Sequence, residues 1–393
     1  LNKPMRIIIP SLIFACCTAL VQGFDHQNIT LRGNLLNSMT VFEKSQKGRV
    51  AFMGGSITEM DGYRPMVMEF LKSRFLETEF EFINAGISST CSTTGAFRLE
   101  RDVLSKGPID LFFLEFAVND DQDAGHRWKA CIRGMEGIIR NLRTQHPRSD
   151  IIVTFFVNPN MLEILMNGEI PRSMGAHEAV LRKYKVSRIH LARELASQIS
   201  EGTFGWEKFG GTHPKPAGNR LCAEMHIKLL ARAWSGTAPV LPQKHFLPPE
   251  PLDEFSYFRG RFFSPSQINL SKGWSYSEPL WTEIKGGKRN RYMNRPLLHA
   301  SFPAAPLNFE FSGTAIGAFV LAGPDAGSIR YVIDGKKRGK VDLYHPNYSK
   351  GLHYPRSVIF AHDLAPGPHQ IIIQPQTSKE GRNTVRLLEF CLN

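Results

Sequence analysis

A serine that follows two glycines is the first group in this sequence with the setting of a nucleophile. Residues 50–65, VAFMGGSITEMDGYRP, lead from an apolar run through Gly54 and Gly55 to Ser56. Glycines leave the hydroxyl open to approach, and open α/β sheets place their sites where strands end. The alternative is a phosphate-binding glycine turn, but neither G-x-x-x-x-G-K nor G-x-G-x-x-G is present. A G-x-S-x-G elbow is also absent. Ser56 is therefore a candidate nucleophile.

Two later strand ends carry groups that can stabilise an oxyanion. The segment INAGISST places Gly86 where its backbone N–H can face the same edge, and EFAVND ends in Asn119, which offers an amide donor. Gly86 can also be an ordinary turn glycine, and Asn119 can cap the next helix. Three suitable residues at three successive strand ends favour a shared site.

A base must take the proton of a serine before the serine can attack, because the neutral hydroxyl is a weak nucleophile. His213 lies in FGGTHPKPAGNRLCAE, a glycine-flanked loop ahead of the last helix of the first domain, and Pro214 suits the first turn of that helix. A loop histidine can also be an ordinary surface residue. Its place before the closing helix makes His213 the best candidate base.

These four blocks together resemble the SGNH, or GDSL-type, hydrolase superfamily, whose name gives Ser, Gly, Asn and His in chain order. The resemblance covers about residues 48–234. It implies that Ser56 is the nucleophile and His213 the general base. It also implies an oxyanion hole made by the backbone N–H groups of Ser56 and Gly86 with the side chain of Asn119.

The sequence departs from the superfamily at the position three residues before the histidine, where the family usually has an acidic residue and this chain has Gly210. A carboxylate there would orient the imidazole. Three interpretations stay open: a backbone carbonyl orients His213 in a Ser–His dyad, Glu207 takes the place of the acid, or the protein binds a ligand with little turnover.

The fold predicted for residues 48–234 is a doubly wound α/β sandwich with a parallel sheet, because continuous apolar runs alternate with amphipathic helical stretches. Residues 235–252 are proline-rich and predict a linker. From residue 253 to 393, short β-type runs separated by Gly, Pro and Asp predict a β-sandwich, which resembles galactose-binding modules.

The first 23 residues have the layout of a secretory signal peptide, with Lys3 and Arg6 ahead of an apolar run. Residues 24–47 are then a lead-in. A membrane anchor is the alternative, but the apolar run is shorter than a span needs. A lipoprotein cleaved before Cys16 fits less well. We therefore expect export to the periplasm or the exterior.

The composition limits the possible partners. The net charge is +12, and residues 251–393 hold 18 Lys and Arg against 11 Asp and Glu. No nucleic-acid motif accompanies this charge, so an acidic polysaccharide or an ordinary solvated surface explains it better. No metal-ligand spacing or cofactor motif is present. The sequence does not fix the pairing of Cys91, Cys131, Cys222 and Cys391, nor the oligomeric state.

Further polar residues are candidates for substrate contacts or, equally, for caps and ion pairs. Those near the four blocks are Thr58, Glu59, Arg98, Arg101, Asp120 and Asp121. The second domain gathers aromatic and polar side chains that suit sugar contact or packing against the first domain: Tyr344, His345, Tyr348, His353 and Tyr354.

The leading hypothesis is a secreted serine esterase that removes O-acyl groups, acetyl first among them, from an oligosaccharide or polysaccharide. A lipase or lysophospholipase is the alternative among enzymes, although no long amphipathic lid is evident. A glycan-binding protein with little turnover is the alternative outside enzymes.

Overall fold

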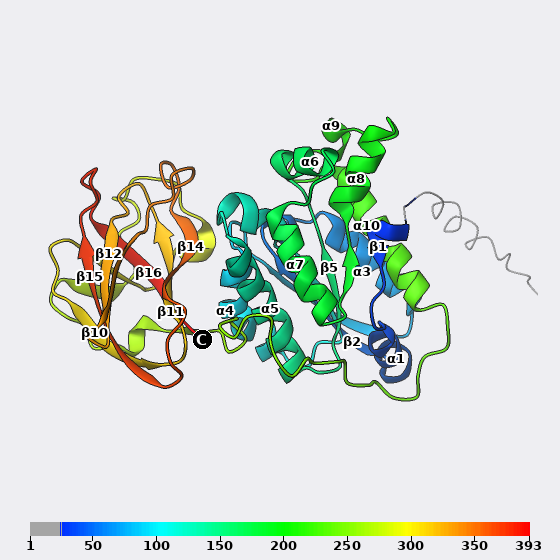
Figure 1. Cartoon of the computed structure of the whole chain (residues 1–393), viewed down its shortest axis with the longest axis horizontal. Coiled ribbons are helices and arrows are strands. Elements are labelled where there is room, and N and C mark those ends of the chain that lie inside the picture. The colour runs from blue at the N-terminus through cyan, green and yellow to red at the C-terminus, as the bar shows by residue number, and fades with distance from the viewer. Residues whose placement is uncertain (1–23, 25) are drawn as a thin grey trace, which may run out of the picture.

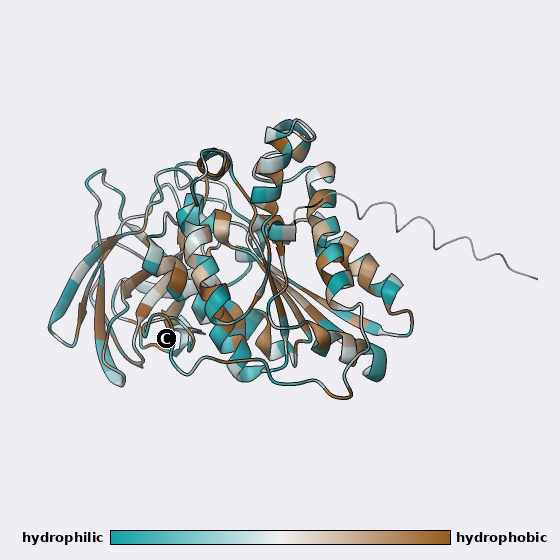
Figure 2. Cartoon of the chain, turned by 45° about the vertical axis from the view of Figure 1, so that its right-hand side comes forward, coloured by the Kyte–Doolittle hydropathy of each residue, from teal (hydrophilic) through white to brown (hydrophobic). Residues whose placement is uncertain are grey.

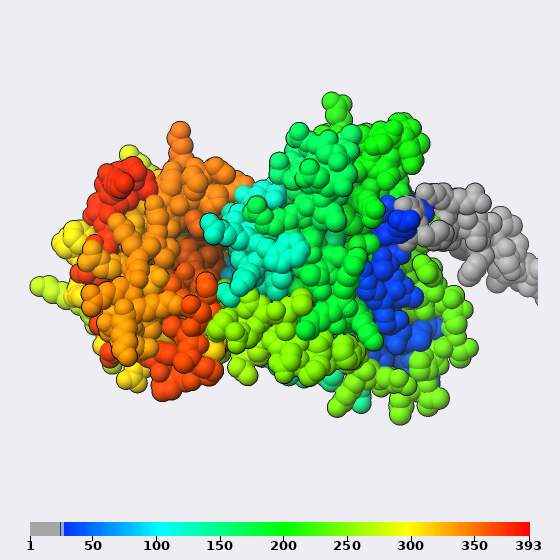
Figure 3. Space-filling model, viewed as in Figure 1, coloured from blue at the N-terminus to red at the C-terminus, as the bar shows by residue number. Residues whose placement is uncertain are grey.

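The computed structural model describes residue 24 and residues 26–393, so the expected signal peptide lies outside the described residues. Two bodies lie side by side along the long axis, an α/β domain and a β-domain (Figure 1). In the space-filling view they touch over a broad contact (Figure 3). No helix in the part of the chain that the structure describes is long and apolar enough to cross a membrane.

The α/β domain is built on one six-stranded sheet with the order β1-β6-β5-β4-β2-β3. Five strands are parallel, and the short edge strand β1 pairs antiparallel with β6. Strand β2 lies between β3 and β4, so the winding direction reverses beside it, and open sheets bind ligands at such a point. The strands are β1 (Ile29–Thr30), β2 (Lys47–Gly54), β3 (Glu79–Gly86), β4 (Leu111–Leu114), β5 (Asp150–Thr154) and β6 (Ser187–Ile189).

Helices cover both faces of this sheet, which confirms the predicted doubly wound fold. Helices α4, α5 and α7 pack side by side on one face, and α3 and α10 pack together on the other. Figure 2 shows apolar residues along the strands and on the helix sides that face them. The helices are α1 (Leu36–Ser45), α2 (Ser56–Glu59), α3 (Tyr63–Arg74), α4 (Ser92–Asp102), α5 (Trp128–Gln145), α6 (Pro159–Met166), α7 (Arg172–Lys183), α8 (Leu191–Ser200), α9 (Trp206–Phe209) and α10 (Pro216–Ala233).

Residues 235–252 contain no helix or strand, and they run along the α/β domain as a fixed strap. His245 Nε2 lies 2.7 Å from Asp150 Oδ1, and Arg143 donates to the carbonyl oxygen of Phe246 at 3.0 Å. Arg140 donates to the carbonyl oxygen of Pro248 at 2.8 Å. Because these contacts fix the strap, it does not act as a free tether between the domains.

The β-domain consists of two antiparallel sheets, as the sequence predicts. One has the order β10-β15-β12-β13; the other has the order β14-β11-β16-β9-β8, with β7 also paired to β16. Strand β10 alternates buried and exposed residues, so one face packs on the core. Strands β7 and β14 contact α4 of the α/β domain. The strands are β7 (Arg261–Phe263), β8 (Trp274–Ser277), β9 (Leu297–Ser301), β10 (Leu307–Ser312), β11 (Ile316–Ala322), β12 (Ser328–Ile333), β13 (Lys337–Asp342), β14 (Tyr354–Ala361), β15 (Pro368–Gln376) and β16 (Thr384–Leu392).

Candidate active site

Ser56 and His213 meet at the carboxyl end of the sheet although 157 residues separate them in the chain. Strand β2 ends at Gly54, and Ser56 opens the one-turn helix α2. Ser56 Oγ lies 2.7 Å from His213 Nε2, on the loop between α9 and α10. A hydroxyl and an imidazole nitrogen at this distance share a hydrogen bond, which is the geometry of an activated nucleophile.

The two glycines before Ser56 are required by close packing as well as by access to the hydroxyl. A Cβ on Gly54 would stand 1.9 Å from Glu115 Oε1, and a Cβ on Gly55 would stand 2.3 Å from Asn119 Oδ1. Both distances are far below a normal contact. The glycine pair therefore lets Glu115 and Asn119, from the neighbouring strand end, lie directly against the turn that carries Ser56.

Glu115 holds the turn that carries Ser56 through two hydrogen bonds. Its Oε1 accepts hydrogen bonds from the backbone N–H of Gly55 and from the hydroxyl of Thr58, both at 2.8 Å. The side chain is buried, and its Oε2 has no hydrogen-bond partner among the described residues. Burial raises the pKa of Glu115 to about 7, although the bonds from Thr58 and Gly55 act in the opposite direction. Sequence reasoning missed this carboxyl group, because Glu115 directly follows the apolar residues of β4 and no motif marks it.

Replacing Glu115 with glutamine is expected to flatten the pH dependence of stability. The pKa of the Glu115 carboxyl group is about 7 in the folded protein, whereas an ordinary glutamate, as in the unfolded chain, has a pKa of 4.5. Between pH 4.5 and pH 7 the folded state therefore holds a proton on Glu115 that the unfolded state has lost. The free energy of unfolding consequently falls as the pH rises through this range. The full loss is about 3 kcal/mol, from the separation of the two pKa values.

The measurement is urea unfolding of both proteins between pH 5 and pH 8. Glutamine keeps an oxygen for Gly55 and Thr58 and carries no charge, so the variant should gain stability relative to the parent as the pH rises. Asp110, whose pKa burial raises to about 6, contributes to the same trend in both proteins. A constant difference between the two proteins across this range would contradict the assignment to Glu115.

Arg98 holds the ends of two strands and is not placed to contact substrate. Its side chain is fully buried. Nη1 donates to the carbonyl oxygen of Ala85 at 2.7 Å, and Nη2 donates to that of Gly54 at 3.0 Å. Nη1 also lies 3.0 Å from Asp102 Oδ2. The guanidinium thus ties β2 to β3 just before Ser56.

Gly86 lies beside the site, but its N–H is already engaged. It donates to Asn84 Oδ1 at 3.0 Å. A Cβ at Gly86 would stand 2.3 Å from the backbone nitrogen of Glu59, so the glycine is needed for the close approach of α2. Three residues later, Ser89 has a φ of 67°, and the described residues offer its N–H no acceptor. The hydroxyl-rich segment SSTCSTTG after Gly86 suggests a wall of the cleft or helix capping, but no backbone donor at Ser89, because nothing in the sequence predicts a left-handed conformation for a serine.

Asn119 is buried against Gly55 and points its amide into the same region. Its Nδ2 donates to Asp123 Oδ2 at 2.6 Å. The β-domain reaches this pair, because His345 Nε2 lies 2.8 Å from the carbonyl oxygen of Asp123. The second hydrogen on Nδ2 remains available to a ligand.

No carboxylate orients His213 among the described residues. His213 is exposed, and Nδ1 has no hydrogen-bond partner in the described part of the chain. Gly210 has a φ of 109°, and a Cβ there would stand 2.3 Å from the backbone nitrogen of Lys215. The backbone at this position therefore disfavours any acidic residue. Glu207 is exposed on α9, and the structure records no hydrogen bond or ion pair for it.

The other polar candidates are engaged within the protein. Thr58 and Arg98 support the turn, as described, and Arg101 forms ion pairs with Asp102 and Glu389. Glu59 Oε1 lies 2.6 Å from Arg291 Nη2 of the β-domain. Asp120 accepts from Ser92, and Asp121 accepts from Asn158. These contacts favour the cap and ion-pair interpretation.

The aromatic loop of the β-domain, residues 344–354, contacts the α/β domain through His345 and Tyr354, whereas His353 contacts Lys285 of its own domain. His345, His353 and Tyr354 are buried. The hydroxyl of Tyr354 donates to the carbonyl oxygen of Ser89 at 3.3 Å, and its ring stacks on Tyr348 at 4.7 Å. Arg289 adds a contact nearby, because it donates to Ser89 Oγ at 2.8 Å. The loop therefore supports the segment after β3.

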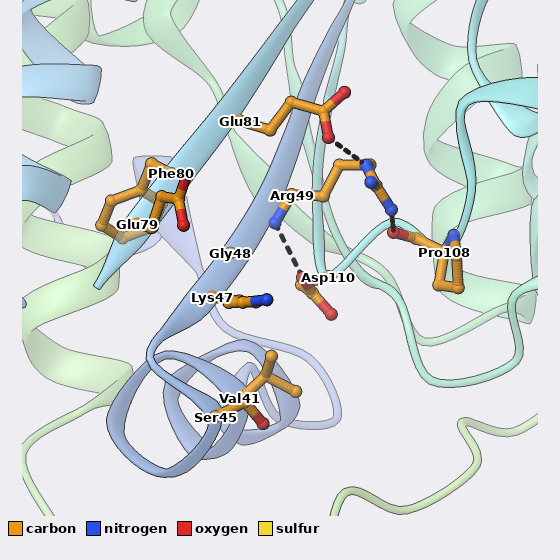
Figure 4. Close-up of a pocket in the computed structure, with 10 residues that line it drawn as sticks. All are labelled: Val41, Ser45, Lys47, Gly48, Arg49, Glu79, Phe80, Glu81, Pro108 and Asp110. Carbon is orange, nitrogen blue, oxygen red and sulfur yellow. Dashed lines mark hydrogen bonds and ion pairs between the residues drawn. The ribbon is translucent and has the colours of Figure 1, made fainter.

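A cavity at the opposite edge of the sheet is not part of this site (Figure 4). It lies at the amino ends of β2 and β3, where Arg49 pairs with Glu81 at 2.7 Å. The backbone N–H of Arg49 donates to Asp110 Oδ2 at 2.8 Å. Ser56 and His213 do not line this cavity.

Comparison with known proteins gives a family match for the α/β domain and solved structures with the same two-domain fold. Residues 52–221 match the model of the GDSL-like lipase/acylhydrolase family. No curated protein sequence matches the chain. Two solved structures are titled as a two-domain esterase (CEX) active on acetylated mannans, and one was co-crystallised with mannopentaose. Each aligns with 94% of this chain over 98% of its own length. The mannopentaose complex has a TM-score of 0.73 at 20% identity, and the other structure has a TM-score of 0.74 at 21% identity. The likeness shows a shared two-domain fold.

Proposed function

Because residues 52–221 match the model of the GDSL-like lipase/acylhydrolase family, we propose that the chain is a secreted serine esterase of this family. Its substrate is an oligosaccharide or polysaccharide, from which it removes O-acyl groups, acetyl first among them. The observation that carries this proposal is the 2.7 Å contact between Ser56 Oγ and His213 Nε2 at the winding reversal of the sheet.

The mechanism uses these two side chains in two half-reactions. Ser56 Oγ attacks the ester carbonyl carbon while His213 Nε2 takes the hydroxyl proton, and the same nitrogen then protonates the departing sugar oxygen. Water, deprotonated by His213, next attacks the acyl-enzyme and releases the acid. In each half-reaction the tetrahedral intermediate carries a negative oxygen that needs hydrogen-bond donors.

The backbone N–H of Ser56 and Asn119 Nδ2 are the donors that we assign to this oxygen. Gly86 was expected to supply a third, but its N–H would first have to leave Asn84 Oδ1. The backbone N–H of Ser89 has no such competitor among the described residues. We therefore place Ser89 beside Gly86 as a candidate for the third donor.

The carbohydrate substrate rests on two observations. The chain shares its two-domain fold with an esterase titled as active on acetylated mannans. Its net charge of +12 also favours a neutral or anionic glycan over a cationic one. Export remains an expectation from residues 1–23.

The test is acetate release from a panel of acetylated polysaccharides that includes mannan, xylan and pectin. Wild-type protein should release acetate from at least one of them, and Ser56→Ala should release none above background. Faster hydrolysis of long-chain than of short-chain p-nitrophenyl esters, without acetate release, would favour the lipase alternative. Binding of a glycan with no turnover would favour the glycan-binding alternative.

Replacing Glu207 with alanine is expected to leave kcat within about twofold of wild type, because nothing in the structure brings this carboxylate to His213. His213→Ala, in contrast, should lose about 10³-fold or more, as for the removal of a catalytic base. The measurement is steady-state hydrolysis of p-nitrophenyl acetate. A loss in Glu207→Ala close to that in His213→Ala would identify Glu207 as the missing acid.

Introducing the family's acid by Gly210→Asp is expected to destabilise the protein and leave kcat no higher. A non-glycine residue at the observed φ of 109° is strained, and the new Cβ would collide with the backbone of Lys215. We expect a loss of about 2 kcal/mol in urea unfolding. Gly211→Asp is the matched control for strain alone, since its φ is 93° but its Cβ meets no atom within 4 Å. Equal losses in the two variants would contradict the role of the Lys215 contact.

A further inference from the structure

A thiol, an imidazole and a carboxylate line up behind the N-terminus of α4, and the ester-hydrolysing mechanism uses none of them. Cys91 directly precedes α4, and its Sγ lies 3.9 Å from His126 Nε2. His126 Nδ1 lies 3.4 Å from Asp120 Oδ1. The hydroxyl of Thr94 lies 3.7 Å from the same sulfur. This is the order of nucleophile, base and orienting acid that activates a cysteine.

Asp120 is held rigidly as the acid of this group. It is fully buried and accepts hydrogen bonds from the Ser92 N–H at 2.8 Å and the Ser92 hydroxyl at 2.7 Å. His177 Nε2 lies 2.9 Å from Asp120 Oδ2, the oxygen that also accepts from the Ser92 hydroxyl. Burial opposes its charge, but His126 and His177 together hold the pKa of Asp120 well below its usual range. Burial likewise opposes the charge on His126, yet Cys91 and Asp120 raise the pKa of this imidazole well above its usual value.

The group borders a cavity of about 340 Å³ between the two domains. Cys91, Thr93 and His126 line it from the α/β domain, and Tyr354 and Arg356 line it from β14. Neither Ser56 nor His213 lines this cavity. Asp123 and Arg356 both line this cavity, and it is the positive charge of Arg356 that interacts with Cys91, so the wall beside the sulfur favours an anionic ligand over a cation.

We propose that Cys91 is the reactive thiol of a modification site in this cavity, with His126 as its base and Asp120 as the acid that orients this base, and that the site takes a low-molecular-weight disulfide carrying a carboxylate. His126 takes the proton of the Cys91 thiol, the sulfur attacks one sulfur of that disulfide, and a new S–S bond forms to Cys91 as the old S–S bond breaks. The other half leaves as a thiolate and takes the proton of His126, so that electrons and protons balance.

The remaining described cysteines serve as internal controls, because burial keeps each of them a neutral thiol. Burial raises the pKa of Cys131 to about 11 and also raises the pKa values of Cys222 and Cys391 above the usual value. A neutral thiol is a poor nucleophile. Cys91 is also buried, but it is the one of these four cysteines that lines the cavity beside His126, so modification of the native fold should select it.

The experiment treats the full chain near pH 7 with oxidised glutathione, and in parallel with iodoacetamide, and locates adducts by peptide mass spectrometry. We expect one adduct, at Cys91, with alkylation at least about tenfold faster than that of free glutathione. A rate at or below that of free glutathione, or an adduct at Cys131, Cys222 or Cys391 instead, would overturn the proposal. This comparison needs only the wild-type protein, so it decides whether or not variants fold.

Two variants sharpen the assignment. His126→Asn should slow alkylation of Cys91 about tenfold, while Arg356→Met should slow iodoacetate more than neutral iodoacetamide. Unchanged rates in both variants would contradict the roles given to these side chains. Stoichiometric zinc binding in calorimetry, lost in Cys91→Ser and blocking alkylation, would assign the cluster as a metal site and overturn the proposal.

Discussion

Replacing Ser56 with alanine is expected to lower kcat for p-nitrophenyl acetate by about 10³-fold or more while the fold stays intact. The change removes the one hydroxyl that lies 2.7 Å from His213 Nε2. Without it no acyl-enzyme can form, and the remaining rate comes from binding and oxyanion stabilisation alone. Ser56 is half-buried and packs lightly, so alanine leaves no sizeable cavity.

Pre-steady-state kinetics tests the same step directly. Wild-type protein should release p-nitrophenol in a burst that corresponds to acylation of Ser56, and Ser56→Ala should show neither burst nor turnover. Ser73→Ala is the matched control, because its exposed hydroxyl on α3 only donates to the carbonyl oxygen of Phe70. Equal rates in wild type and Ser56→Ala would end the esterase proposal.

The fold class could be predicted from the sequence because buried parallel strands have a recognisable pattern. The proximity of the candidate site residues could be predicted because they follow the ends of such strands. Continuous apolar runs identify buried parallel strands, and parallel strands end at one edge. Ser56, Gly86 and Asn119 each follow such a run, so their proximity could be inferred without coordinates. His213 was found by its place before the last helix, which the structure starts at Pro216 instead of Pro214.

The sequence could not show why particular residue types are needed at several of these positions, because the need comes from contacts between distant segments. Gly54 and Gly55 are small because Glu115 and Asn119 press against them. Local pattern predicts an open turn there but cannot reveal what fills it. The contacts of Ser89 with Arg289 and Tyr354 likewise join distant segments, which are 200 and 265 residues apart in the chain.

Replacing the buried Arg98 with methionine is expected to cost about 3 kcal/mol of stability and much of the esterase activity. Arg98 donates to the carbonyl oxygens of Ala85 and Gly54, one residue before Gly86 and Gly55. Methionine fills part of the volume but donates no hydrogen bond, so buried carbonyl groups lose their partners. The ends of β2 and β3 would then separate more easily, and Ser56 follows one of them.

Arg101→Met is the matched control for this prediction, since Arg101 is on the same helix and pairs with the same Asp102 but is 41% exposed. An exposed pair contributes less than about 1 kcal/mol, so this variant should unfold in urea close to wild type. Arg98→Lys should fall between the two, because one ammonium group reaches both carbonyl oxygens less well than a guanidinium fork. If Arg98→Met and Arg101→Met lost stability equally, the ion pair with Asp102 would account for the effect. A larger loss in Arg98→Met, accompanied by a fall in kcat at unchanged KM, would show that the tie between strand ends holds Ser56 in its reactive position.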